Sequence, residues 1–364
     1  MRRSLAAAAL LCSLASMGTP TAAAQAAAGD WHQVGLPFLW PTAGLTDVSA
    51  TDPSNVWITG VQGGICIPQI ASWGCSWSSD GNPVARRWNG SSWQEYPLPG
   101  YSGNGQLSRV ATAGPNDVWG AGSDFPHQPR YLAHFDGSVF TKIEPPVSNA
   151  YFKVFAGKGG TWLTTSVDNR DTVLHRRIGD TWQATQVGNI SYVTDVRART
   201  ATDVWAVGAV RESDRERAAV ARWDGQAWQA VDYPRNDGRL TQVLPVSATE
   251  VWATVGTISG YVVRWNGSEW SRIDLPTGVD DVELAVDGSG SIWAGGHELV
   301  QVDGNTRSRP VLISYTGGGW QRVSVAMPWG ASGMSINGLA SVPGTGALWA
   351  VANSSTGPVV LTNG

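Results

Sequence analysis

The stretch that decides the fold is DVWAVG, residues 203–208, together with RWDGQAW, residues 222–228, which begins 14 residues after it. Variants of this pair recur along the chain, as NVWITG with RWNGSSW, DVWGAG with HFDGSVF, and EVWATV with RWNGSEW. Short apolar runs joined through Asn-Gly or Asp-Gly are typical of antiparallel strands connected by tight hairpins. Each repeat therefore predicts a small antiparallel sheet.

One tryptophan marks the same position in each repeat, and seven such anchors are present: Trp57, Trp119, Trp162, Trp205, Trp252, Trp293 and Trp349. Successive anchors lie 41 to 62 residues apart. A period of about 40 to 50 residues with about four strands per unit is typical of a β-propeller. We therefore predict an all-β, seven-bladed β-propeller with four antiparallel strands per blade, in which the anchors fill the gaps between blades.

The last repeat stops after its third strand, in GPVVLTNG at residues 357–364. A counterpart of the missing strand lies at the other end of the chain, where DWHQVGLP, residues 30–37, matches GGWQRVSVAMP, residues 318–328. We predict that this N-terminal strand completes the last blade and closes the ring. Closure would pair sheet edges that are otherwise open. Residues 29–364 are thus expected to form a single propeller domain.

The segment before the propeller has the pattern of a secretory signal peptide. Residues 1–28 contain two arginines, an apolar run over residues 5–17, and small residues in Ala-x-Ala order. The run is too short to span a bilayer permanently. We expect a secreted, extracellular protein without membrane insertion, the alternative being a buried N-terminal helix. The formal net charge of −4 argues against nucleic acid as a partner.

Two of the three cysteines, Cys66 and Cys75, lie beyond this segment. Disulfides persist in exported proteins, so we predict a Cys66–Cys75 bridge that stiffens the loop CIPQIASWGC. Nearby His or Cys residues at zinc-binding spacing are absent from the sequence, as are a G-x-S-x-G elbow and a calcium-loop pattern. We therefore expect neither a metal nor a cofactor.

The connections between strands alternate between two faces of a propeller. The first-to-second and third-to-fourth turns are short and uniform here, and we call their side the short-turn face. The second-to-third and blade-to-blade connections vary widely in length, as in residues 61–83 and 295–310, and we call their side the variable-loop face. Binding usually resides on irregular loops held by a rigid scaffold, so we expect the ligand on the variable-loop face.

A polar residue precedes the first core position of nearly every innermost strand. These residues are Asp47, Arg109, Lys153, Asp195, Gln242 and Glu283, with Gly338 in the seventh blade. We expect them to form a mixed-charge ring at the mouth of the channel. Two interpretations stay open: the ring seals the channel by mutual salt bridges, or it receives a ligand or a partner's tail.

Trp73, Trp77 and Trp329 match no repeated packing position, unlike most other tryptophans of the chain. We predict that they form an aromatic platform on which sugar rings stack, with Asp47 and Gln242 fixing the sugar hydroxyls. The alternative is that each tryptophan merely covers its own loop.

The unit DVWAVG … RWDGQAW … YP resembles the repeats of secreted seven-bladed propellers of actinobacteria. It is similar to the propeller lectin component of umbrella-shaped antibacterial toxin particles. The likeness extends over residues 30–364, although blade three departs from it with GTWLTT at residues 160–165. The resemblance implies recognition of a glycan or cell surface and docking to a partner subunit of a toxin assembly. It transfers no binding residue by position.

A carbohydrate-active enzyme, either a glycosidase or a polysaccharide lyase, is the alternative function on this scaffold. Its acid pair would come from acids on the variable loops: Asp168, Asp171, Glu212, Asp214 and Glu298. Acids on solvated loops more often serve solubility. The sequence therefore favours a lectin-like binding module over a catalyst.

Overall fold

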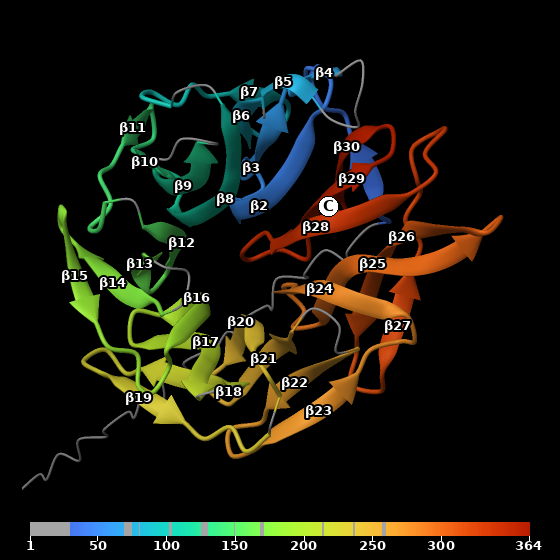
Figure 1. Cartoon of the computed structure of the whole chain (residues 1–364). Coiled ribbons are helices and arrows are strands. Elements are labelled where there is room, and N and C mark those ends of the chain that lie inside the picture. Colours follow the sequence, from blue (N-terminus) through green and yellow to red (C-terminus); the bar gives the residue numbers. More distant parts are fainter. Residues whose placement is uncertain are drawn as a thin grey trace, which may run out of the picture.

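The computed structural model describes residues 30–68, 75–79, 81–101, 104–124, 130–148, 150–167, 171–212, 215–235, 237–256 and 260–364. It is a ring of seven four-stranded antiparallel sheets around a central channel (Figure 1). The predicted seven-bladed β-propeller is confirmed. In the part of the chain that the structure describes, no helix has the length and apolar character to cross a membrane. The predicted signal peptide, residues 1–28, lies outside the described residues.

The first strand of each blade lines the channel and the fourth lies at the outer rim (Figure 1). Blade one consists of β2 (Gly44–Asp52), β3 (Asn55–Gln62), β6 (Asn82–Trp88) and β7 (Trp93–Glu95). Blade two consists of β8 (Gly105–Gly114), β9 (Asp117–Asp124), β10 (Arg130–Phe135) and β11 (Phe140–Lys142). Blade three consists of β12 (Tyr151–Gly157), β13 (Gly160–Ser166), β14 (Val173–Ile178) and β15 (Thr181–Thr185). Blade four consists of β16 (Tyr192–Thr200), β17 (Asp203–Glu212), β18 (Arg215–Trp223) and β19 (Trp228–Val231). Blade five consists of β20 (Leu240–Ser247), β21 (Glu250–Val255), β22 (Tyr261–Trp265) and β23 (Trp270–Asp274). Blade six consists of β24 (Val279–Val286), β25 (Ile292–Val302), β26 (Asn305–Tyr315) and β27 (Trp320–Val323). Blade seven consists of β28 (Met334–Ser341), β29 (Leu348–Ser354), β30 (Gly357–Thr362) and β1 (His32–Val34). A separate hairpin, β4 (Ile65–Pro68) with β5 (Cys75–Ser79), extends from blade one.

In four blades, an acid or asparagine two residues before the anchor tryptophan accepts a hydrogen bond from the buried indole. In blade four, Asp203 accepts a hydrogen bond from Nε1 of Trp205 at 3.0 Å and another from Arg222 at 2.7 Å. The same i, i+2 contact joins Asn55 to Trp57, Asp117 to Trp119 and Glu250 to Trp252. A buried tryptophan needs a partner for its N–H group, and the spacing in DVW supplies one.

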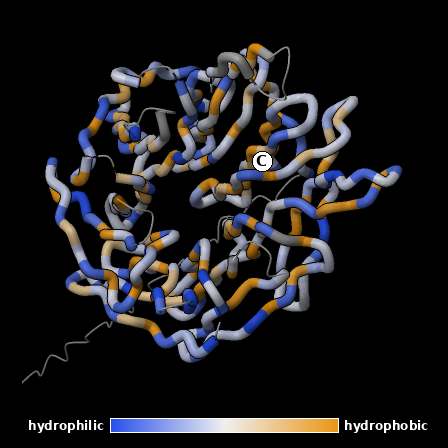
Figure 2. Tube along the Cα trace, viewed as in Figure 1, coloured by the Kyte–Doolittle hydropathy of each residue, from blue (hydrophilic) through white to orange (hydrophobic). Residues whose placement is uncertain are grey.

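Four anchors also pack against an aromatic pair of the next blade: Trp57, Trp162, Trp252 and Trp349. Trp162 of blade three lies 5.6 Å from Trp223 and 5.3 Å from Trp228 of blade four. Trp349 of blade seven packs in the same way on Trp88 and Trp93 of blade one. Hydrophobic segments follow the strands inside the ring, whereas many turns of the outer rim are hydrophilic (Figure 2). The tryptophans thus fill the gaps between blades, as predicted.

The N-terminal strand closes the ring. β1 pairs antiparallel with β30, with His32 opposite Thr362 and Val34 opposite Val360. Trp31, only 9% exposed, lies 5.9 Å from Trp293 in the core between blades six and seven. The predicted completion of the last blade by the N-terminal segment is confirmed.

Candidate binding face

Exposed large hydrophobic side chains gather on the variable-loop face. Among the residues that the structure describes, all but two of them lie in its loops or at the strand ends beside these loops. They are Phe38, Trp40, Ile65, Ile67, Tyr151, Val167, Val173, Leu299 and Trp329. The two exceptions, Val139 and Ile178, lie beside tight turns of the short-turn face. Exposed apolar groups that adjoin one another mark an interaction surface, whereas single ones are ordinary.

Four of these side chains, Phe38, Trp40, Ile65 and Ile67, come from two segments that are hydrogen-bonded to each other at their base, and we call them the blade-one patch. Phe38 and Trp40 are 72% and 62% exposed, and their rings lie 5.5 Å apart at 75°. Both come from the connection between β1 and β2, whereas the isoleucines come from β4. The hydroxyl of Thr42 donates to the carbonyl oxygen of Gly64, which holds the connection against the base of the hairpin.

A buried arginine fixes this connection. Arg86 of β6 is 4% exposed and donates to the carbonyl oxygens of Pro37 at 3.0 Å and Phe38 at 2.9 Å. It also pairs with Glu95 at 2.7 Å. Gln62 accepts from the backbone N–H of Trp40 at 3.2 Å and donates to Glu95 at 3.1 Å. A guanidinium with its donors engaged on several sides holds a backbone rigidly, and rigid presentation lowers the entropic cost of binding.

The predicted aromatic platform is only partly within the described structure. Trp329 is 99% exposed and lies in the connection between β27 and β28. Trp73 lies outside the described residues, and of Trp77 only the backbone, in β5, is described. In the hairpin, Cys66 lies opposite Ser78 and Pro68 opposite Cys75. Since the side chain of Cys75 is not among those described, the Cys66–Cys75 bridge stays a prediction.

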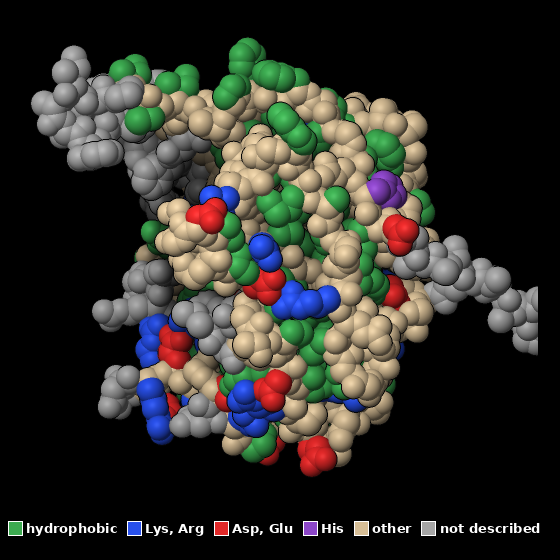
Figure 3. Space-filling model, turned by 90° about the vertical axis from the view of Figure 1, so that its right-hand side faces the viewer, with side chains coloured by type: hydrophobic (Ala, Val, Ile, Leu, Met, Phe, Trp, Pro, Cys, Tyr) green, Lys and Arg blue, Asp and Glu red, His purple; other side chains and the backbone are tan. Residues whose placement is uncertain are grey.

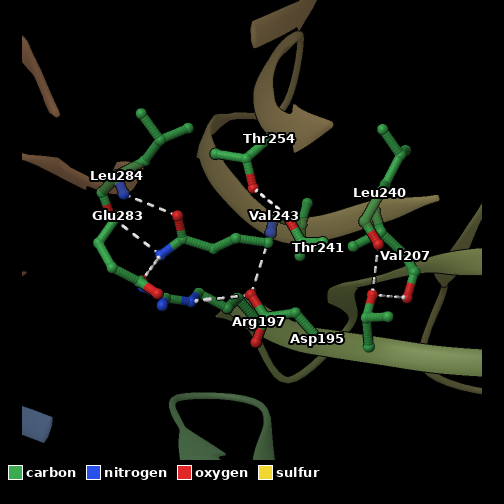
Figure 4. Close-up of polar contacts among 11 residues, drawn as sticks. Asp195, Arg197, Val207, Leu240, Thr241, Val243, Thr254, Glu283 and Leu284 are labelled. Carbon is green, nitrogen blue, oxygen red and sulfur yellow. Dashed lines mark hydrogen bonds and ion pairs between the residues drawn. The ribbon is translucent and has the colours of Figure 1, made fainter. Parts of the chain in front are cut away.

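The predicted polar ring lies inside the channel and joins neighbouring blades. Asp47 of blade one accepts from the backbone N–H of Val110 in blade two at 3.0 Å. Asp195 of blade four accepts a hydrogen bond from the backbone N–H of Val243 in blade five at 3.0 Å (Figure 4). Gln242 of blade five accepts one from the backbone N–H of Leu284 in blade six at 2.7 Å. These acceptor atoms are therefore engaged by protein, which gives Asp47, Asp195 and Gln242 a structural role.

A β-bulge directs these side chains to the next blade. The register of the first two strands shifts immediately before the ring residue in six blades, at Asp47, Arg109, Asp195, Gln242, Glu283 and Gly338. Blade three pairs without a shift, and its Lys153 is exposed. At the seventh position, Gly338, a Cβ would make a tight contact of 3.3 Å with the backbone nitrogen of Val48.

A cavity of about 660 Å³ occupies the channel between the ring and the short-turn face. Its walls come from the inner strands of all seven blades and include Asp47, Arg109, Asp195, Arg197 and Glu283. Burial raises the pKa of the Glu283 carboxyl to about 7, although Arg197 and Arg109 act against this shift. Burial likewise raises the pKa of Asp47, opposed chiefly by Arg109.

Three of the five acids that would serve a glycosidase are engaged by arginines, whereas Asp168 and Asp214 lie outside the described residues. Asp171 pairs with Arg211 at 3.6 Å. Glu212 accepts from Arg215 at 3.1 Å and from Arg217 at 3.0 Å, and Glu298 accepts from Arg322 at 2.8 Å. On the side of the molecule that carries β25, β26 and β27, acidic and basic side chains are likewise interspersed (Figure 3). Within the described residues, no three His, Cys, Asp or Glu side chains are grouped to hold a metal ion.

Comparison with known proteins places the chain in the β-propeller class. No protein-family model matches the sequence, and no curated protein does. Among solved structures, "YCF48 bound to D1 peptide" is similar with a TM-score of 0.55 and 17% identity, over 91% of this chain and 94% of that one. The WD40 propeller domain of Doa1 is similar with a TM-score of 0.58 and 13% identity, over 91% of this chain and 96% of the other.

A catalytic propeller is also similar. The GH74 xyloglucanase from Xanthomonas campestris matches with a TM-score of 0.54 and 15% identity, over 89% of this chain and 53% of that one. At these identities the likeness establishes the fold alone. The propeller scaffold is consistent with a binding or docking module, and the fold leaves the choice of ligand to the site itself.

Proposed function

We propose that this protein is a binding module that docks its ligand on the variable-loop face, with the blade-one patch at the centre of the contact. The observation that carries the proposal is the pair Phe38 and Trp40, which a buried arginine holds in place while their rings stay largely exposed. Aromatic anchors on a fixed backbone dominate the energetics of many interfaces, each contributing about 2 kcal/mol or more.

Within this function we propose lectin-like recognition of a glycan or cell surface. Aromatic rings offer flat apolar faces on which sugar rings stack, and Phe38, Trp40 and Trp329 are exposed in this way. The resemblance of the repeats to lectin propellers of toxin particles supports the same assignment. We do not assign the hydrogen bonds to the sugar hydroxyls to Asp47 and Gln242, because their side chains are engaged by backbone N–H groups inside the channel.

A protein partner is the second candidate, and a specific observation favours it. Ile65 and Ile67 are 53% and 51% exposed beside the aromatic pair. Aliphatic side chains pack well against protein but offer no flat face to a sugar. A partner subunit of a toxin assembly would meet this description, and a propeller of similar fold has been solved with a bound peptide.

Export belongs to the proposal as well. We propose that residues 1–28 are removed during secretion and that the mature chain carries the Cys66–Cys75 disulfide. Mass spectrometry of the protein from culture supernatant tests both points. A mature N-terminus near residue 29 with one disulfide supports them, and an intact N-terminus with free thiols contradicts them.

Binding of the labelled protein to arrays of glycans and of peptides tests the proposed function. The wild-type chain is expected to bind glycans, the Phe38→Ala/Trp40→Ala variant to lose this binding, and the Val139→Ala/Ile178→Ala variant to keep it. The control removes two exposed hydrophobic side chains from the short-turn face. Binding to peptides alone would replace the lectin assignment by the protein-docking one. Turnover of a polysaccharide by the protein would overturn the binding-module proposal.

A further inference from the structure

The acidic side chains of the central cavity are already engaged by protein donors. Both oxygens of Asp47 accept backbone N–H groups, from Val48 at 2.9 Å and Val110 at 3.0 Å. Asp195 accepts from Val243 and from Nε of Arg197. Glu283 accepts from the Gln242 amide at 2.7 Å (Figure 4).

The basic side chains of the same cavity have donors to spare. Arg109, half-buried in the wall, forms no hydrogen bond or ion pair with any described residue, and its guanidinium lies 5.8 Å from the Phe155 ring. Arg197 uses Nε for Asp195 at 3.2 Å, and its terminal nitrogens have no hydrogen-bond partner in the described part of the chain. It extends toward Glu283 (Figure 4) without forming an ion pair with it.

Although burial acts in the opposite direction, the carboxylates of Asp47, Asp195 and Glu283 attract the Arg109 guanidinium and raise its pKa. None of them accepts a hydrogen bond from it, so its N–H donors stay available to a further acceptor. Its flat fork of donors matches the two oxygens of a carboxylate or phosphate. Burial raises the pKa of Glu283, and the charges of Arg197 and Arg109 both act to lower it, so both guanidinium groups lie close enough to interact with this one carboxyl. The cavity volume of about 660 Å³ falls in the usual range for ligand pockets.

We propose that the central cavity binds an oxyanion, a carboxylate or a phosphate, at Arg109 and Arg197, with entry from the short-turn face. The site is separate from the blade-one patch and does not rest on the proposed function. An acidic peptide and free phosphate both present this chemistry. Lys158 lines the cavity on the side of entry and adds a positive charge there.

Isothermal titration calorimetry of the mature protein at low ionic strength tests the site, with inorganic phosphate and a tetraglutamate peptide as probes. Wild type is expected to bind at least one probe, and Arg109→Gln and Arg197→Gln each to bind it at least about tenfold more weakly. Arg322→Gln, which removes an arginine on the outer strand β27, serves as the control and is expected to bind like wild type. Binding of phosphate alone identifies a phosphate site, and binding of the peptide alone identifies an acidic-peptide site.

A second measurement keeps the test independent of variant folding. Wild-type crystals soaked in selenate are expected to show anomalous density beside Arg109 and Arg197. Density elsewhere only, no binding of either probe to wild type, or equal weakening by Arg322→Gln would each overturn the proposal.

Discussion

Asp203 and Trp205 form the unit from which this ring is built. The carboxylate of Asp203 accepts the indole N–H of Trp205 at 3.0 Å, and Arg199 and Arg222 engage the same carboxylate at 2.6 and 2.7 Å. Asp203 is 3% exposed and Trp205 1% exposed. The motif DVW … RW therefore encodes, in one short stretch, a buried carboxylate paired with a partly exposed arginine and a tryptophan that fills the gap between blades.

Replacing Asp203 with alanine is expected to destabilise the protein by about 2 to 4 kcal/mol, because a buried indole N–H and two arginines lose their acceptor. Asp203→Asn keeps an acceptor for Trp205, so the loss should be smaller. Urea unfolding of both variants measures the difference. A change below about 0.5 kcal/mol for Asp203→Ala would mean that the contact is not needed for stability.

Loss of the closing strand is expected to weaken the whole domain. Deletion of residues 30–37 removes the pairing of β1 with β30 and uncovers the core at Trp293. Trp31→Ala alone should destabilise the protein by about 3 to 5 kcal/mol, because it leaves a cavity in that core. Gln33→Ala, on the exposed side of β1, is the matched control. Thermal unfolding checks these effects, and a truncated protein that melts like the intact one contradicts the closure.

The fold could be predicted from the sequence because the repeats carry the same local signals, a tight turn and an anchor tryptophan. The Asn-Gly and Asp-Gly turns set the hairpins, and the anchor tryptophans set the blades. Blade three shows the limit of these signals. Gly160 stands there two residues before Trp162, whose Nε1 atom has no hydrogen-bond partner among the described residues.

The candidate site was harder to predict because burial, not residue type, decides its members. Phe38 and Trp40 resemble packing aromatics, and their position in FLWPT, outside any repeat, was the available signal. The polar character of the ring residues is visible in the sequence. Their hydrogen bonds to the next blade depend on a β-bulge that no sequence pattern indicates. Gln242 reaches Leu284 of the next blade only because the register shifts before it.

Protonation of Glu283 should make stability depend on pH. Its pKa is about 7 in the folded state, raised by burial from 4.5, so the folded state holds this proton more tightly than the unfolded state does. The resulting stabilisation is complete below the lower value and is lost as the pH rises through the higher one. Arg109, Arg197, Asp47 and Asp195 act on this carboxyl, and Gln242 donates to it.

Between about pH 5 and about pH 8, this group should remove about 2 kcal/mol from the free energy of unfolding, allowing for its partial exposure. Glu283→Gln should abolish that part of the pH dependence. Urea unfolding of both proteins across this range is the measurement. An identical slope for wild type and variant would show that Glu283 titrates in its ordinary range.

Arg86 should act on binding without touching the ligand. Arg86→Ala removes the donors that hold the carbonyls of Pro37 and Phe38 and leaves Glu95 without its pair. Hydrogen exchange in residues 37–42 is expected to accelerate while the other blades keep their protection. Unchanged exchange in this segment would mean that the connection is rigid without Arg86.

The most direct test of the binding face is the affinity of the strongest array ligand for two matched double variants. Phe38→Ala/Trp40→Ala is expected to weaken binding by about 30-fold or more, with little change in melting temperature. Val139→Ala/Ile178→Ala, on the short-turn face, should bind within about twofold of wild type. Equal binding by the first variant, or loss of binding in the second alone, would contradict a ligand site on the variable-loop face.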